Sequence, residues 1–333
     1  MTLKFIMLPP QSGEMNTWGD RLALALPELK VVVAKDEQEA ERAIVDADAA
    51  YGTISPELLS KAGRLRWLQV SKSAPRPGYY YPELIAHPVV VTNMRETFND
   101  HIGTHVMAFV LAFARGLQHY FPLQVKREWR PLPQGEGVVH LPEATALIVG
   151  VGGVGAEVAR LAASFGMYVI GVDPRRESAP PGVRELYRPE RLDELLPRAD
   201  FVILTAPHTP ATDGMFDRAR FQRMKRTAFF INTGRGKTTR LEDLTAALIA
   251  REIAGAGLDV FEEETGKKGA RERDAHLRAD HPLWNMPGVI MTPHTAMYGP
   301  YVDERRFDIL LDNCRRFIAG QPLRNLVDKK NWF

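Results

Sequence analysis

Residues 145–173, TALIVGVGGVGAEVARLAASFGMYVIGVD, decide the fold of this chain. A short apolar run is followed by three glycines spaced as G-x-G-x-x-G, at Gly150, Gly152 and Gly155, and then by a helical pattern. A second apolar run ends at Asp173, 18 residues after Gly155. This order of strand, glycine turn, helix and acid-terminated strand is typical of a dinucleotide-binding βαβ unit.

Each glycine of the turn has a mechanical reason. Gly150 permits the tight turn, Gly152 lets the backbone approach a pyrophosphate, and Gly155 lets the helix lie close to the strand. The pyrophosphate would meet free N–H groups at the positive end of the helix, where Gly153 and Val154 lie. A strand, turn and helix without a ligand is the alternative, but the acid at the second strand end favours a bound nucleotide.

The residues after the second strand decide between NAD and NADP. The Asp173 carboxylate can accept hydrogen bonds from both ribose hydroxyls and would repel a 2′-phosphate, so it favours NAD. Arg175 and Arg176 follow at once, and a guanidinium can pair with that phosphate. Because the arginines lie beyond the strand end, we predict NAD, with Asp173 at the ribose and Arg175 beside the adenine. NADP is the less favoured cofactor.

Outward from this unit, short apolar runs alternate with helical patterns along the chain. The predicted strands are LKFIMLP, KVVVA, DAAYGTI, LRWLQVS and PVVVTNM before residue 95, and TALIVG, YVIGVD, FVILTA, AFFINT, IAGAGLDV and GVIMTP after residue 144. Continuous apolar strands between helices indicate parallel sheets covered on both faces. Because 333 residues are many for one core, the sequence predicts an α/β fold with two doubly wound, Rossmann-like domains.

The composition narrows the class of protein. The 43 basic and 41 acidic residues give a formal net charge of +2, which does not suggest a nucleic-acid surface. Cys314 is the single cysteine, so no internal disulfide can form, in keeping with a reducing compartment. The sequence has neither a recognisable secretory signal nor an apolar run of membrane-spanning length. We therefore expect a cytoplasmic protein, and no motif predicts a metal site.

Polar residues follow the strands of the second series. Arg235 comes after AFFINT, three glutamates at 262–264 come after GAGLDV, and His294 comes after GVIMTP. Pro207 and His208 follow FVILTA. Ligands of open α/β sheets bind beyond the carboxyl ends of the strands, so an arginine, an acid and a histidine are expected at one edge of the sheet.

At this point the chain resembles the D-isomer-specific 2-hydroxyacid dehydrogenases. The resemblance spans about residues 60–330 and is carried by GVGGVG, INTGRG, AGAGLDVFEEE, HPLW with VIMTPHTA, and RRFIAGQPLRNLVDK. It implies a substrate domain of residues 1–98 plus 294–333, an NAD-binding domain of residues 99–293, and an active-site cleft between them. It also implies a homodimer, with the helix from Asn99 and the segment HYFPLQVKREWRPL as the dimer arm.

The resemblance also implies roles that fit the chemistry of 2-oxo acid reduction. Arg235 holds the substrate carboxylate and polarises the adjacent carbonyl. His294 is the acid/base that exchanges a proton with the substrate oxygen. The family's spacing selects Glu264 as its partner acid, which leaves Glu262 and Glu263 facing solvent. In the cofactor site, Asp259 binds the nicotinamide carboxamide, joined by two strand-end residues, Pro207 and Thr233.

The chain departs from the family pattern in two places. In the loop SKSAPRPGYYY, Pro75 stands where a glycine is expected, so we predict that Ser73 and Ala74 contribute N–H groups, or Arg76 its side chain, to the substrate carboxylate. Relatives have an apolar residue and an acid where Thr239 and Arg240 stand, and we expect an effect on helix capping rather than on chemistry. Trp284 is assigned to the substrate site, with packing in the core as the alternative.

These observations favour an NAD-dependent dehydrogenase that transfers hydride to and from C2 of a small 2-hydroxy or 2-oxo acid, of the glyoxylate/hydroxypyruvate reductase type. One alternative is a nucleotide-sensing binding protein of the same fold without turnover. Another is a dehydrogenase acting on formate or phosphite. A sensor needs no proton donor, so the set of Arg235, Glu264 and His294 argues for the enzyme.

Overall fold

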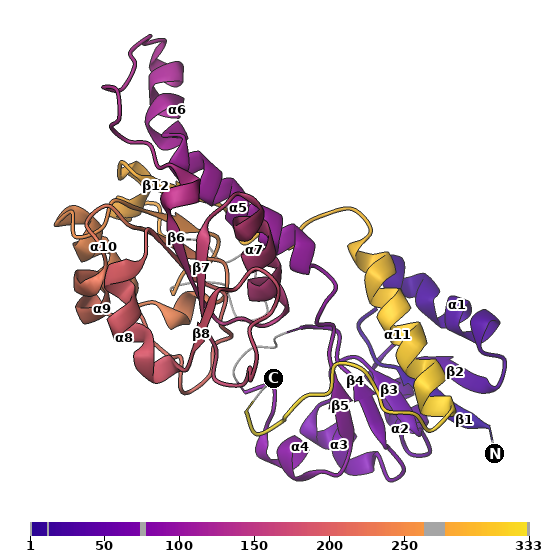
Figure 1. The fold of residues 1–333 in the computed structure, drawn as a ribbon. Helices are drawn as coiled ribbons and strands as arrows, with labels where there is room; N and C mark the ends of the chain where they lie inside the picture. Colours follow the sequence, from indigo (N-terminus) through magenta and orange to yellow (C-terminus); the bar gives the residue numbers. More distant parts are fainter. Residues whose placement is uncertain (1, 12, 74–77, 263–276, 332–333) are drawn as a thin grey trace. The chain divides into compact units, whose positions relative to one another are not determined.

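The structure is a computed structural model that describes residues 2–11, 13–73, 78–262 and 277–331. Its contacts divide the chain into unit 1, formed by Met1–Thr97 with Gly299–Phe333, and unit 2, formed by Phe98–Tyr298. Each unit is built on its own parallel sheet, which confirms the predicted fold class (Figure 1). The second boundary falls a few residues after the predicted position at residue 294, because the turn after that strand is bonded into unit 2.

Unit 1 contains the first five predicted strands. They are β1 (Leu3–Met7), β2 (Leu29–Val33), β3 (Ala49–Tyr51), β4 (Trp67–Gln69) and β5 (Val90–Thr92). All pairs are parallel, in the order β2-β1-β3-β4-β5. The order reverses next to β1, as in a doubly wound sheet.

Helices cover both faces of this sheet, which is why its strands are apolar throughout. One face carries α1 (Trp18–Ala25) and α11 (Val302–Ile318); the other carries α2 (Glu37–Ile44), α3 (Pro56–Lys61) and α4 (Pro82–Ala86). Their starts are readable in the sequence: the Asp36 side chain accepts the N–H of Glu39 at 2.8 Å, and α3 begins with Pro56.

Unit 2 contains a seven-stranded parallel sheet. Its strands are β6 (Thr145–Val149), β7 (Tyr168–Val172), β8 (Glu185–Tyr187), β9 (Phe201–Leu204), β10 (Phe229–Asn232), β11 (Gly255–Leu258) and β12 (Val289–Met291). They run in the order β12-β11-β10-β9-β6-β7-β8. The strand order reverses between β6 and β9, and in such sheets the ligand crevice lies at that point.

Unit 2 is also covered on both faces. Helices α5 (Asn99–Ala114) and α7 (Gly153–Ser164) pack on one face; α8 (Leu192–Leu195), α9 (Arg218–Arg223) and α10 (Leu241–Ile249) pack on the other. Short 3-10 turns include η5 (Gly236–Thr238) and η7 (Pro282–Asn285). Helix α5 lies close to α7 because Gly103 has no side chain; a β-carbon there would lie 2.9 Å from Glu157 Cγ.

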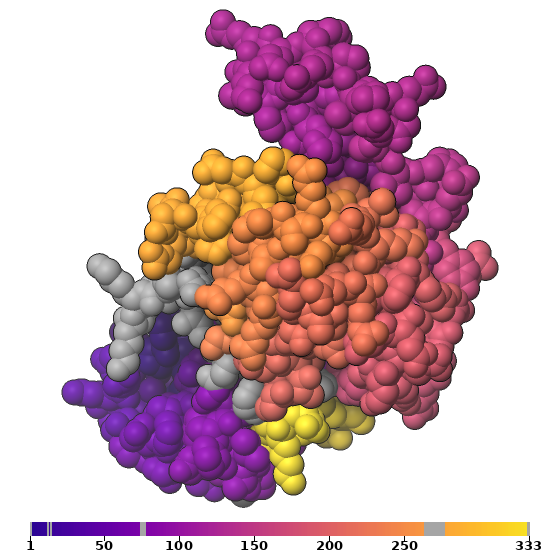
Figure 2. All heavy atoms as spheres, turned by 90° about the vertical axis from the view of Figure 1, so that its left-hand side faces the viewer, coloured from indigo at the N-terminus to yellow at the C-terminus, as the bar shows by residue number. Residues whose placement is uncertain are grey.

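The helix α6 (Leu117–Lys126) and the residues after it project from unit 2, and we call residues 117–139 the arm. Figure 1 shows α6 leading away from the sheet, and Figure 2 shows the arm standing clear of the rest of this unit. Among the helices that the structure describes, none is long and apolar enough to cross a membrane.

Candidate active site

The glycine turn after β6 has the geometry that its sequence predicts. Gly150 adopts a φ of +94°, which disfavours residues with a side chain, and a β-carbon there would lie 2.7 Å from the Ala206 backbone. A β-carbon at Gly155 would lie 2.0 Å from the carbonyl oxygen of Gly150. These two glycines therefore let β6, α7 and the loop after β9 approach one another.

Two features of this edge fit a bound dinucleotide. Within the described residues, a β-carbon at Gly152 would meet no atom within 4 Å, so the backbone of the turn is open on that side, beside the N-terminus of α7. The buried hydroxyl of Thr233, at the end of β10, has no hydrogen-bond partner in the described part of the chain. The open glycine surface can take a pyrophosphate, and the unmatched hydroxyl can take a polar group of the ligand.

The acid at the end of β7 is bound to the glycine turn. Asp173 is 5% exposed, and its Oδ2 accepts the N–H of Val151 at 2.9 Å. Its Oδ1 accepts the N–H groups of Arg175 at 2.9 Å and Arg176 at 3.1 Å. The Arg176 guanidinium donates to the carbonyl of Val151. Asp173 thus holds the two loops together, and one acceptor position on Oδ2 remains for a ribose hydroxyl.

The loop after β9 is held by its own polar residues. The carbonyl of Pro207 accepts the Thr212 hydroxyl at 2.7 Å. Nε2 of His208 lies 2.8 Å from a carboxylate oxygen of Asp213, and the His208 side chain is 14% exposed. His208 therefore has a definite polar partner within this loop.

The loop that carries Arg235 is organised by a residue that sequence reasoning missed. The buried Asn232 accepts the N–H of Gly234 at 3.0 Å and donates to the Arg235 carbonyl at 3.2 Å. The Arg235 side chain is partly exposed and donates to the Gly234 carbonyl at 2.7 Å. The signal was a buried amide at the end of the apolar run AFFIN, which is an uncommon place for a polar side chain.

The glycines beside Arg235 are needed for close contact between loops. A β-carbon at Gly236 would lie 1.8 Å from the carbonyl oxygen of Phe261, and one at Gly234 would lie 2.7 Å from that of Ala206. The loop after β10 is therefore pressed against the loops after β9 and β11. This contact, rather than freedom of movement, places Arg235.

The Asp259 carboxylate, after β11, accepts hydrogen bonds from the turn after β12 that carries His294. Asp259 is 1% exposed; its Oδ1 accepts the Thr292 hydroxyl at 2.6 Å and the Thr295 N–H at 2.8 Å, while Oδ2 accepts the Ala296 N–H at 3.0 Å. His294, between these donors, has a φ of +54°. The buried carboxylate holds a turn whose central residue is in the left-handed region.

Of the three glutamates after β11, Glu262 is the one that lies within the described residues. Glu264, the predicted partner acid, lies outside the described residues with Glu263. The expectation that Glu262 faces solvent is wrong. Its Oε2 accepts the N–H of Leu241, the first residue of α10, at 2.7 Å, and Oε1 lies 3.5 Å from the Arg240 guanidinium.

This arrangement explains the departure at Arg240. As the residue before α10, Arg240 makes no side-chain cap, and Glu262 supplies an acid to the helix N-terminus instead. Because the donor and acceptor come from separate loops, the sequence alone did not reveal the replacement. The structure thus shows how α10 begins without a side-chain cap from Arg240, and the expectation that this departure leaves the chemistry unaffected stays a prediction.

Some predicted substrate contacts lie in or beside undescribed residues. The Ser73 hydroxyl donates to the Met94 carbonyl at 2.6 Å, whereas Ala74 and Arg76 lie outside the described residues. Trp284 is 50% exposed on η7 and donates its indole N–H to the Arg278 carbonyl at 2.8 Å. The alternative that Trp284 packs in the core is therefore wrong.

With this geometry established, the chain can be compared with known proteins. A family model described as D-isomer specific 2-hydroxyacid dehydrogenase, NAD binding domain, matches residues 107–296. A glyoxylate reductase of Korarchaeum cryptofilum is 30% identical over 326 residues, which are 95% of this chain and 90% of the relative. A glyoxylate/hydroxypyruvate reductase B of Klebsiella pneumoniae is 32% identical over 302 residues, 87% of each chain.

Solved structures show the same fold. An NADPH-dependent glyoxylate/hydroxypyruvate reductase from Sinorhizobium meliloti, in complex with NADP and sulfate, matches with a TM-score of 0.80 at 29% identity. The match covers 99% of this chain and 100% of that one. The region matched by the family model contains the glycine turn, the Arg235 loop and the Asp259–His294 turn.

Proposed function

The chain belongs to the D-isomer-specific 2-hydroxyacid dehydrogenases, and we propose that it reduces glyoxylate or hydroxypyruvate with NADH. At the level of the family, it is an oxidoreductase that uses a nicotinamide dinucleotide and acts on the CH–OH group of 2-hydroxyacids. The choice of substrate rests on its similarity to the glyoxylate and hydroxypyruvate reductases.

One observation carries the proposal: the ends of three neighbouring strands are aligned. Asn232 of β10 pairs with Leu258 of β11, and Leu258 pairs with Met291 of β12. Arg235 and His294 therefore each follow three residues after an aligned strand end. A cation and an imidazole at one edge of the sheet are the groups that reduction of a 2-oxo acid requires.

Each residue has a defined role in the proposed reaction. Arg235 pairs with the substrate carboxylate and withdraws electron density from the adjacent carbonyl. His294 donates a proton to the carbonyl oxygen in reduction and accepts it back in oxidation. Glu264 stabilises the protonated imidazole. The bound nicotinamide supplies the hydride.

We assign NAD rather than NADP to this site because of Asp173. Its carboxylate is fixed by three backbone N–H groups and keeps one acceptor position on Oδ2, at the place where the ribose of a bound nucleotide is expected. A 2′-phosphate there would place two like charges together. Arg175 is exposed in the same loop, in keeping with a position beside the adenine.

The experiment is a panel of 2-oxo acids assayed with NADH and with NADPH. We expect turnover of glyoxylate and hydroxypyruvate, with the higher kcat/KM for NADH. His294→Ala should bind NADH with the wild-type Kd, measured by nicotinamide fluorescence, and lose turnover by a factor of about 10²–10⁴. Full turnover by this variant, or tight NADH binding by the wild type without turnover of any 2-oxo acid, would contradict the proposal.

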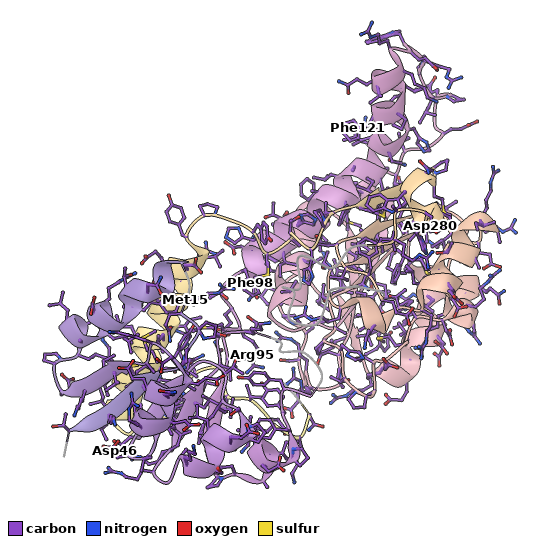
Figure 3. All side chains as sticks on the ribbon, turned by 180° about the vertical axis from the view of Figure 1, so that it is seen from behind. Met15, Asp46, Arg95, Phe98, Phe121 and Asp280 are labelled. Atoms are coloured by element: carbon purple, nitrogen blue, oxygen red, sulfur yellow. The ribbon has the colours of Figure 1, made fainter. Side chains whose placement is uncertain are left out.

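We also infer that the protein is a homodimer joined through the arm. Leu117, Phe121 and Val125 recur every four residues on α6 and are all exposed, and Trp129 beyond the helix is fully exposed. Figure 3 shows Phe121 on this projecting helix. A stripe of exposed apolar side chains on a helix fits a second copy of the same surface.

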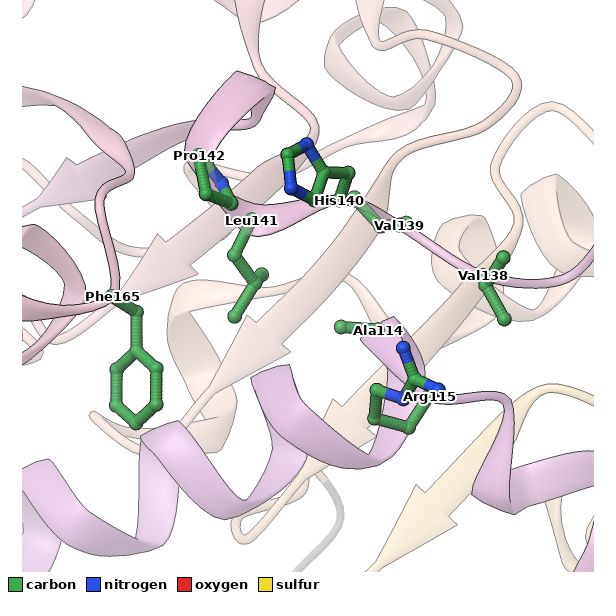
Figure 4. A pocket seen from close by; sticks show the side chains of 8 residues that line it. All are labelled: Ala114, Arg115, Val138, Val139, His140, Leu141, Pro142 and Phe165. Carbon is green, nitrogen blue, oxygen red and sulfur yellow. The ribbon is translucent and has the colours of Figure 1, made fainter. Parts of the chain in front are cut away.

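A hollow also lies at the base of the arm, beside the start of α6. It is lined by Ala114, Arg115, Val138, Val139, His140, Leu141, Pro142 and Phe165 (Figure 4). Light scattering at micromolar concentration should give twice the chain mass of 37.4 kDa. Phe121→Glu with Val125→Glu should give the single-chain mass, whereas Gln124→Glu, an exposed position outside the apolar stripe, should not. A wild-type protein with the single-chain mass would refute the dimer.

A further inference from the structure

His105 on α5 is a partly buried histidine to which the proposed reaction assigns no task. Its Nε2 lies 2.9 Å from the Thr292 hydroxyl oxygen, at the end of β12. Helix α5 approaches the sheet closely because β11 contains Gly257, where a β-carbon would lie 2.8 Å from Phe109 Cγ. The imidazole of His105 then packs edge-on against the Phe109 ring, with 4.9 Å between the ring centres.

The hydrogen bonds around Thr292 have a definite direction. The Thr292 hydroxyl has one proton and donates it to the Asp259 carboxylate, which can only accept. Thr292 therefore accepts from His105, so Nε2 of His105 carries a proton. A continuous chain of hydrogen bonds therefore runs from His105 through Thr292 to Asp259, which is the final acceptor.

Asp259 is where this chain meets the turn that carries His294. The same carboxylate accepts the N–H groups of Thr295 and Ala296, which directly follow His294. The N–H of His294 donates to the Thr292 carbonyl at 3.0 Å. Thr292 thus contacts the turn through both its side chain and its backbone.

The turn needs such support because of its backbone conformation. His294 has a φ of +54°, and the left-handed region costs a residue with a side chain roughly 1–2 kcal/mol. Such a conformation persists only where the surroundings determine it. Without the donor at His105, Thr292 and Asp259 would keep their mutual bond but lose the contact that ties them to α5.

We propose that His105 is a positioning residue, which through Thr292 and Asp259 fixes the turn that holds the imidazole of His294 in place for proton transfer. The inference rests on the proposed role of His294 as the acid/base. Burial holds the pKa of His105 below its usual value, against the opposing effect of Asp259. The neutral, Nε2-protonated ring is therefore the form that acts at neutral pH.

The test compares loss of the donor with its conservative replacement. His105→Leu removes the donor, Thr292→Val removes the hydroxyl, and His105→Gln keeps an N–H at similar reach. We expect Leu and Val to lower kcat by about tenfold, with KM and the NADH Kd within about twofold of wild type. His105→Gln should retain kcat within about threefold. Thr245→Val, which removes another buried threonine hydroxyl on α10, should leave kcat unchanged.

A pH profile separates positioning from a general loss of structure. Glu264 is proposed to stabilise the protonated imidazole of His294, and a loose turn weakens that stabilisation, which lowers the pKa of His294. The alkaline limb of kcat in the reduction direction should therefore move to lower pH in His105→Leu and stay in place in His105→Gln. Wild-type kcat and profile in His105→Leu, or equal losses in Leu and Gln that follow their Tm, would overturn the proposal. Loss of turnover in His294→Ala alongside such a result would leave the proposed function standing.

Discussion

The Asp259 carboxylate accepts the N–H of Thr295 at 2.8 Å, so a strand-end acid of β11 directly holds the residue after His294. The resemblance to the family implies that this acid also contacts the nicotinamide, which stays a prediction. The structure adds that Asp259 is nearly inaccessible and already accepts three hydrogen bonds from the turn that carries the proposed acid/base. Changes at Asp259 should therefore affect the position of His294 as well as cofactor binding.

Asp259→Asn should lower both stability and kcat. The amide group keeps one acceptor oxygen and turns its NH₂ toward a backbone N–H, of Thr295 or of Ala296, which can only donate; this costs about 1–3 kcal/mol of unfolding free energy. Because the turn loosens, we expect kcat to fall by about tenfold or more. Urea unfolding and initial-rate kinetics measure the two effects.

Asp48→Asn is the matched control for this variant. Asp48 is also a buried carboxylate, and it accepts the Lys4 N–H at 2.9 Å and an Arg64 N–H at 3.1 Å within unit 1. It should lose comparable stability while keeping kcat. Equal kcat values for the two variants would show that Asp259 does not act through the His294 turn.

Substitutions in the glycine turn can separate effects on NADH affinity from effects on folding stability. Gly152→Ala places a methyl group in open space, so the protein should fold with a Tm within about 2 °C of wild type. The methyl group lies where a pyrophosphate would approach, and the NADH Kd should rise by about tenfold, or 1.4 kcal/mol. Fluorescence titration and thermal unfolding test this pair of outcomes.

Gly155→Ala should show the opposite behaviour. Its methyl carbon would lie 2.0 Å from the Gly150 carbonyl oxygen, so α7 must shift away from β6. We expect a loss of stability of about 1–3 kcal/mol or more, measured by urea unfolding. If Gly152→Ala binds NADH as tightly as wild type, the cofactor does not approach the turn from the open side.

Much of this fold could be predicted because its strands lie in short, continuous apolar runs that alternate with helical patterns, as in parallel sheets covered on both faces. Eleven predicted strands appear in the described structure, whereas β8 was missed. β8 has only three residues, Glu185 to Tyr187, at the edge of the sheet, so it needs no continuous apolar run. Edge pairing depends on the neighbouring strand and leaves little pattern in the sequence.

The site was predictable where it follows strand ends and was missed where partners lie far apart in the chain. Arg235 and His294 stand at the ends of apolar runs, so topology places them at one edge. His105 is 187 residues from Thr292, and Glu262 is 21 residues from Leu241, so no local spacing signals either contact. Only the packing of α5 and α10 on the sheet creates these pairs.

The balance between NADH and NADPH should depend on Asp173. Asp173→Asn removes the charge that repels a 2′-phosphate, while Arg175 and Arg176 remain in the same loop. We expect the ratio of kcat/KM for NADH to that for NADPH to fall by about tenfold or more. The measurement is the kcat/KM of each cofactor at a saturating 2-oxo acid concentration.

Arg176→Gln in the Asp173→Asn background is the complementary change. It removes a cation that could pair with the phosphate, so kcat/KM for NADPH should fall again by about threefold or more. An unchanged cofactor ratio in Asp173→Asn would mean that the carboxylate serves only to join the loop to the glycine turn.

Helix α10 should be sensitive to an acid that is distant in sequence. Glu262→Ala removes the acceptor for the Leu241 N–H and a negative charge at the helix N-terminus, which should cost about 1 kcal/mol of unfolding free energy. Adding Arg240→Ser places a capping hydroxyl at the residue directly before α10, and about half of the lost unfolding free energy should be recovered. No recovery in the double variant would mean that Glu262 stabilises the loop after β11 rather than α10.

Glu185, on the edge strand β8, should make the unfolding free energy depend on pH in the acidic range. Hydrogen bonds from Arg198, Tyr187 and Tyr168 lower the pKa of Glu185 to about 2. Since the pKa of the folded state is the lower one, the carboxylate stabilises the fold fully above about pH 4.5, and this contribution declines as the pH falls toward 2.

Glu185→Gln isolates that contribution. Because the Glu185 side chain is 23% exposed, solvent weakens its ion pair, and we expect the variant to lose about 1 kcal/mol of unfolding free energy at pH 7. The difference in unfolding free energy between wild type and variant should begin to decrease below about pH 4.5. Glu177→Gln, a change at an exposed carboxylate on the loop after β7, should have the unfolding free energy of wild type both at pH 7 and below pH 4.5. A difference for Glu185→Gln that stays constant down to pH 3.5 would show that the neutral side chain binds Arg198 and the tyrosines equally well.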